Sequence, residues 1–174
     1  MRTRAAAAAL ALVATACFGP DPNVNERGEG RPEVAVSFPD RVAASSTPTA
    51  RVEVSNPGPG DIPSLVVAFA LVGPGAGQTE VPDPLVGFGR RGRNPSIVEV
   101  VPEPTSVSRD AVVFTFEAAE GGGPLLPEGE STTIAFRIRA PVGPGVVANS
   151  VTVYDGTDPS RVRGARLETT VQSS

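Results

Sequence analysis

Apolar and polar residues alternate along much of the chain. In residues 50–55 the apolar Ala, Val and Val are separated by Arg, Glu and Ser, which is the two-residue period of a strand with one face in water. Residues 65–72 are instead eight consecutive apolar residues with proline and glycine on either side. Because eight residues are few for a helix, this run predicts a central strand that is buried on one face and largely covered on the other. Its larger side chains share one face: Leu65, Val67, Phe69 and Leu71.

Further segments with the same period follow between glycine- and proline-rich turns. The alternation is clearest in residues 131–139, where Ile134, Phe136 and Ile138 face one side and two arginines face the other. Strands are expected at residues 33–38, 50–55, 64–72, 97–101, 111–117, 131–139, 146–154 and 163–171. About seven to eight short strands at regular spacing are typical of an antiparallel β-sandwich, which we predict for residues 33–174. The phenylalanines expected in its core are Phe38, Phe69, Phe114, Phe116 and Phe136.

Residues 73–96 form the longest stretch without a periodic pattern, and loops of this length are uncommon in compact domains. Either residues 85–88 add a short edge strand, or the segment is a functional insertion. Three basic residues, Arg90, Arg91 and Arg93, gather in it. They could contact an anionic ligand or partner through their guanidinium groups. The interpretation that the sequence favours is a solvated hairpin tip that keeps a sheet edge from aggregating.

The composition excludes several kinds of chemistry. The chain has 174 residues with no His, Lys or Trp, so it has no Ser-His-Asp triad, His-ligated metal or Schiff-base lysine. The conceivable acid–base pairs are Glu117 with Glu120, or Glu117 with Asp110, and a single Tyr offers little aromatic surface to a sugar. Asp155 and Asp158 are too few carboxylates for Ca²⁺ and are expected to form a tight turn. We therefore predict no enzyme activity, cofactor or metal, and the net charge of −4 disfavours nucleic acid.

The N-terminus has the features of an export signal. Residues 5–16 are almost wholly apolar and follow two arginines, but twelve helical residues rise about 18 Å, too little for a hydrocarbon core of about 30 Å. The sequence Val-Ala-Thr-Ala-Cys that ends at Cys17 resembles the bacterial lipobox, and Cys17 is the only cysteine. We therefore expect a lipoprotein signal peptide over 1–16, and a lipidated Cys17 with a flexible linker over 17–32. An ordinary secretory signal that leaves a free thiol is the alternative.

Two longer stretches resemble bacterial immunoglobulin-like modules of the conserved-repeat and CARDB (cell-adhesion-related) types. VEVSNPGPGDIPSLVVAFAL resembles their strand, Asn-x-Gly turn and second strand, and LLPEGESTTIAFRIRAP resembles a later strand through Leu126, Gly129, Glu130 and Ser131. The resemblance covers most of 33–172 and implies an immunoglobulin-like sandwich without catalytic residues. This chain differs from the family in having a single copy and a long insertion at 73–96.

Together these features predict a non-enzymatic lipoprotein of the cell envelope. We expect an extracytoplasmic domain, anchored to the bacterial cell membrane by lipid, that serves as a protein-interaction, adhesion or scaffold module with a cell-envelope protein as partner. The alternative is an extracytoplasmic protein that binds a small ligand or anion through residues 73–96. A hydrolase is a third interpretation, which the absence of His, Lys and Trp disfavours.

Overall fold

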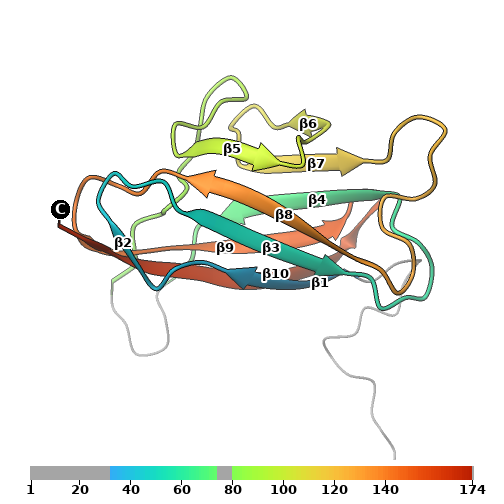
Figure 1. Cartoon of the computed structure of the whole chain (residues 1–174), viewed down its shortest axis with the longest axis horizontal. Coiled ribbons are helices and arrows are strands. Elements are labelled where there is room, and N and C mark those ends of the chain that lie inside the picture. Colours follow the sequence, from blue (N-terminus) through green and yellow to red (C-terminus); the bar gives the residue numbers. More distant parts are fainter. Residues whose placement is uncertain (1–31, 74–79, 174) are drawn as a thin grey trace, which may run out of the picture.

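Two facing β-sheets form the domain, as the computed structural model shows for residues 32–73 and 80–173. One sheet has four strands in the order β1 (Glu33–Ser37), β3 (Thr49–Ser55), β8 (Ser131–Ile138) and β5 (Ile97–Val101). The other has six, in the order β2 (Arg41–Ala43), β10 (Asp158–Gln172), β9 (Gly145–Asp155), β4 (Ser64–Ala70), β7 (Val113–Glu117) and β6 (Ser106–Val107). Figure 1 shows the two layers stacked with β8 and β3 in front of β4 and β9. The predicted all-β sandwich is confirmed.

The strand pairing is antiparallel except at one edge, where β2 runs parallel to β10. The strands β2 and β6 were not predicted, because three and two residues are too short to show a period. The apolar run is a central strand as expected, since β4 lies between β9 and β7. No helix in residues 32–73 and 80–173 is long and apolar enough to cross a membrane.

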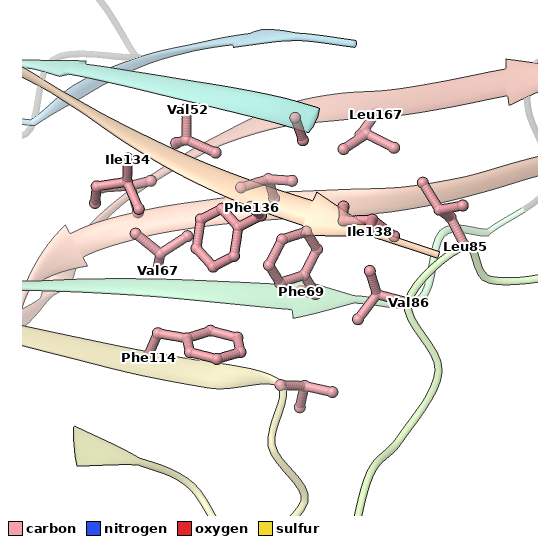
Figure 2. Packing of buried hydrophobic residues seen from close by; sticks show 14 of the residues in the cluster. Val52, Val67, Phe69, Leu85, Val86, Phe114, Ile134, Phe136, Ile138 and Leu167 are labelled. Carbon is pink, nitrogen blue, oxygen red and sulfur yellow. The ribbon is translucent and has the colours of Figure 1, made fainter. Parts of the chain in front are cut away.

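The core lies between the sheets where the alternating apolar residues meet. Phe136 contributes the central ring, and its centroid lies 5.0 Å from that of Phe69 and 5.2 Å from that of Phe114, both edge-to-face. Aromatic rings favour this arrangement because the positive edge of one meets the negative face of another (Figure 2). Phe116 is also buried, and Phe38 packs partly buried against the cluster, so the predicted phenylalanine core is confirmed.

Two expectations for the segment after β4 are corrected. The strand ends at Ala70, and Leu71 is 55% exposed, so the prediction that it shares the buried face of Leu65 is wrong. Residues 85–88 form no strand; Leu85 and Val86 instead fill the end of the core from a loop (Figure 2). The apolar character of these residues therefore reflects burial rather than sheet pairing.

The predictions for the signal peptide, Cys17 and the linker concern residues that lie outside the described part, apart from Pro32 at the end of the linker.

Candidate functional site

The segment that carries the predicted basic residues is fixed to the sandwich by a buried asparagine. Asn149 on β9 is fully buried; its Oδ1 accepts a hydrogen bond from the Val86 amide at 2.8 Å. Its Nδ2 donates to the carbonyl oxygens of Val86 at 3.0 Å and Ala70 at 3.2 Å. One side chain thus joins the end of β4, β9 and the loop, while Leu85 and Val86 enter the core beside it.

The basic residues form a tight hairpin turn. The Arg90 amide donates to the Arg93 carbonyl at 2.9 Å, and the Arg93 amide donates back to the Arg90 carbonyl at 3.1 Å. The two residues between them have positive φ, 54° at Arg91 and 72° at Gly92, as in the two-residue turns that connect twisted strands. This hairpin tip is the structure that one of the two sequence interpretations predicted.

A second turn packs against the hairpin and brings a fourth arginine to it. The Gly89 amide donates to the Asp110 carbonyl at 2.6 Å, and the Gly92 amide donates to the Arg109 carbonyl at 2.9 Å. A Cβ atom at Gly89 would clash with the carbonyl oxygen of Arg93, so only glycine allows this approach. Arg90, Arg91 and Arg109 line an open depression of about 530 Å³. Arg109 was not predicted from the sequence, because only its charge marked it and its place depends on a tertiary contact.

Asn94 supports the base of the hairpin. Its Nδ2 donates to the carbonyl oxygens of Gly87 at 2.7 Å and Ala111 at 3.2 Å. Its Oδ1 accepts a hydrogen bond from the Ser96 amide at 2.9 Å. The loop before the hairpin, the turn before β7 and the start of β5 are therefore tied to one buried side chain.

We call Arg90, Arg91, Arg93 and Arg109 the arginine tip. All four are exposed, and none forms an ion pair with another residue of the described ranges. Asp110 adds a carboxylate to the depression, and its Oδ1 accepts a hydrogen bond from Ser108 Oγ at 2.5 Å. The tip therefore presents four guanidinium groups to solvent in a chain whose net charge is −4. Guanidinium groups bind carboxylate and phosphate oxygens in paired hydrogen bonds.

An open groove lies on the other side of the hairpin, between β5 of one sheet and β6 and β7 of the other. Its volume is about 810 Å³, and Ile97, Val98 and Val100 of β5 line one wall. Val107 and the buried Phe114 line the other. Arg93 and Glu103 also line the groove; Arg93 precedes β5 and Glu103 follows it. The groove is therefore mainly apolar, with Glu99 in the middle of the β5 wall, and it carries opposite charges at its two ends.

The other candidate residues take part in local structure. Asp155 is buried and accepts hydrogen bonds from the amide and hydroxyl of Thr157 at 2.8 and 2.7 Å, which forms the expected tight turn. Hydrogen bonds from Ser160, with a smaller contribution from the charge of Arg161, lower the pKa of Asp158 below its usual value. The described residues contain no group of three or more His, Cys, Asp or Glu side chains that could hold a metal ion.

The conceivable acid–base pair of Asp110 and Glu117 is not brought together. Asp110 precedes the start of β7, and Glu117 is the last residue of that strand, so an extended segment separates them. Glu120, the other partner considered for Glu117, is exposed in the turn beyond β7.

Comparisons with known proteins found two solved structures that resemble the chain only distantly. No protein-family model and no curated protein matches the sequence. Among solved structures, the CARDB domain of the PF1109 protein from Pyrococcus furiosus, solved in complex with di-metal ions, is 16% identical with a TM-score of 0.48; the match covers 87% of this chain and 97% of that one. The ASH/PapD-like domain 7 of human CEP192 is also 16% identical with a TM-score of 0.38, covering 96% and 98%. The β-sandwich of this chain is established by its own two sheets.

Proposed function

We propose that the chain is a non-enzymatic interaction module of the bacterial cell envelope that holds an anionic protein partner through the arginine tip. The observation that carries the proposal is the gathering of four exposed arginines that have no ion pair within the described ranges. Two interlocked turns hold them in place through backbone hydrogen bonds. A solvated turn needs neither the second loop nor so many like charges in one place.

The backbone at Arg91 adds support. Its φ of 54° is a conformation in which Gly or Asn is strongly favoured, because the Cβ atom of other residues crowds the following carbonyl. An arginine at this position costs stability and repels its neighbours, so the turn itself does not account for it. Strained residues of this kind gather at binding sites, where the function of the side chain offsets the strain.

The membrane anchor forms the other half of the proposal. Lipid on Cys17 would hold the domain on the outer side of the membrane, and two or more acyl chains are needed for a stable hold. The support is the short apolar segment of residues 5–16 followed by the single cysteine of the chain. The linker that follows would span roughly 20 Å if flexible.

A second candidate is a small inorganic anion such as phosphate or sulfate, which the same guanidinium groups would bind. The geometry favours a protein partner, because the arginines surround a protruding hairpin and an open depression rather than an enclosed pocket. An enclosed site desolvates a small ion on several sides, and a large partner can cover an open surface.

The test compares two triple variants of the soluble domain in pull-down from an envelope extract at about 0.01 and about 0.1 M salt, where the screening lengths are about 30 and about 10 Å. The tip variant replaces Arg90, Arg91 and Arg93 with Ser. The control variant, with the same change of net charge, replaces three exposed arginines on β2, β3 and β10 with Ser: Arg41, Arg51 and Arg166.

We expect the tip variant to keep its melting temperature, because exposed charges contribute little to stability. It should lose partner capture, most clearly at low salt, while the control variant captures as wild type does. Equal yields from wild type and the tip variant at both salt concentrations would contradict the proposal and favour the interpretation of the hairpin as a solvated tip. Calorimetric titration of wild type with phosphate and sulfate tests the second candidate directly.

A further inference from the structure

We propose that the groove beside the arginine tip accepts one extended peptide segment of the partner, which pairs with β5 as an added strand. The segment runs antiparallel to β5, places apolar side chains in the groove and sets an acidic C-terminal end on the arginines. This inference rests on the proposed function, because it uses the same arginines and names the part of the partner that they hold.

The first support is the free edge of β5. This strand is the last of its sheet and pairs with β8 alone among the described residues. Its other side leaves backbone amide and carbonyl groups without a strand partner, and such edges bind extended peptides by adding a strand. Val98 and Val101 on β5 are 43% and 52% exposed, so apolar surface accompanies the free edge.

The second support is the shape of the groove. A strand added beside β5 would extend the four-stranded sheet and face β6 across the groove, since β6 is the corresponding edge of the other sheet. Side chains alternate along a strand, so every second residue of the peptide would point toward Phe114 and Val107. Small β-branched residues suit these positions because they fit a pleated surface and bury apolar area.

The third support is the charge at the two ends. Arg93 precedes the start of β5 by four positions, and the other tip arginines lie just beyond it. Glu103 lies past the end of β5, is exposed, and forms no ion pair within the described ranges. Glu99, by contrast, forms an ion pair with Arg137, in which Oε2 of Glu99 lies 2.7 Å from Nη1 of Arg137.

For the proposed antiparallel direction, these charges determine which end of the peptide is acidic. A strand antiparallel to β5 begins near Glu103 and ends near the arginines, so it matches both charges if it is basic at its start and acidic at its end. The five residues of β5 correspond to about 17 Å of strand, so about five residues of the peptide would pair.

The probe for this inference is a ten-residue peptide with the sequence Lys-Thr-Val-Thr-Val-Thr-Val-Asp-Asp-Glu, carrying a fluorophore on its amino end. Its binding to the soluble domain is followed by fluorescence anisotropy. The matched control peptide keeps the composition and exchanges the ends, so that the acidic residues come first. We expect the control peptide to bind at least tenfold more weakly, because in the antiparallel direction both of its ends meet like charges. Equal binding of the two peptides would overturn the antiparallel direction.

Two protein variants separate the groove from the tip. Val98→Glu places a charge on the wall of the groove without touching the core. It should weaken binding of the probe peptide at least tenfold. Val142→Glu makes the same change at a residue that is 83% exposed in the loop before β9, and should bind as wild type does. Melting temperatures of both variants check that neither effect comes from unfolding.

Backbone pairing has its own test. N-methylation of the three valines and N-methylation of the three threonines give two peptides with the same number of blocked amides. Alternate amides of a strand point to opposite sides, so one peptide should lose binding and the other should keep it. Equal binding by both peptides would overturn strand addition.

The remaining outcomes are also decisive. If neither the probe peptide nor the control peptide binds, yet capture of the partner from the envelope extract still depends on the arginines, the groove inference is overturned and the proposed function stands. If capture is also independent of the arginines, both fail. If sedimentation shows that the domain dimerises and that Val98→Glu abolishes the dimer, a second copy of this chain occupies the edge and the peptide inference is overturned.

Discussion

Arg91 combines an unfavourable backbone conformation with an exposed charge. One substitution at this residue should therefore change stability and partner binding in opposite directions. Its φ of 54° costs about 1 kcal/mol relative to glycine. We expect Arg91→Gly to raise the melting temperature by about 3 °C and at the same time to weaken partner capture. Ser45→Gly is the matched control, because Ser45 has a φ of 60° on an exposed turn far from the tip in the sequence. It should raise the melting temperature without changing capture. A loss of both stability and capture in Arg91→Gly would show that the side chain supports the turn.

Phe136 is the residue on which the core depends most directly. It is fully buried and contacts the rings of Phe69 and Phe114 from the opposite sheet. Phe136→Ala should lower the free energy of unfolding by about 3–5 kcal/mol, through lost burial and the cavity that remains. Phe88→Ala removes the same ring where it is 65% exposed and should change the value by less than about 0.5 kcal/mol. Denaturant unfolding measures both; similar values for the two variants would contradict the assigned core.

At the scale of the element, the clearest sequence signals come from strands in which burial alternates along the chain. In β8 the residues Ile134, Phe136 and Ile138 are buried and the intervening ones are partly or fully exposed, so burial repeats with the period of the side chains. The beginning of β10 was missed, since residues 158–162 carry little apolar alternation and a register shift follows. The end of β4 was placed too late, because hydrophobicity continues past Ala70 while the chain leaves the sheet at the hydrogen bond from Asn149.

The candidate site was predictable only in part, for a related reason. Arg90, Arg91 and Arg93 lie close together in the sequence, and one of the two sequence interpretations placed them on a solvated hairpin tip. Arg109 joins them through backbone hydrogen bonds between two loops, and Asn94 fixes their base through tertiary contacts. Turn chemistry is local and can be deduced from residue types, but the contact of two turns depends on how the sheets pack.

At the scale of the molecule, the strand directions place the arginine tip at the end away from the chain's entry into the domain. The strand β5 is antiparallel to β8, β8 to β3, and β3 to β1, so β5 starts at the end opposite to the start of β1. Figure 1 shows the start of β5 and the start of β1 toward opposite ends of the long axis. A domain tethered through its N-terminus would therefore present the tip away from the membrane, where a partner can reach it.

That orientation has meaning only if the anchor exists, and the anchor depends on one residue. We expect full-length protein to fractionate with membranes and Cys17→Ser protein to be found in the soluble extracytoplasmic fraction, because lipid chains are the only hold on the membrane that the sequence suggests. Labelling with a radioactive fatty acid should mark wild type and not the variant. The matched control is Ser37→Ala, a hydroxyl change at an exposed position of β1, which should remain in the membrane fraction. If Cys17→Ser stays with the membranes as wild type does, lipid on Cys17 is not the anchor. If wild type itself is found in the soluble extracytoplasmic fraction, residues 1–16 act as an ordinary secretory signal, and the arginine tip belongs to a freely exported protein.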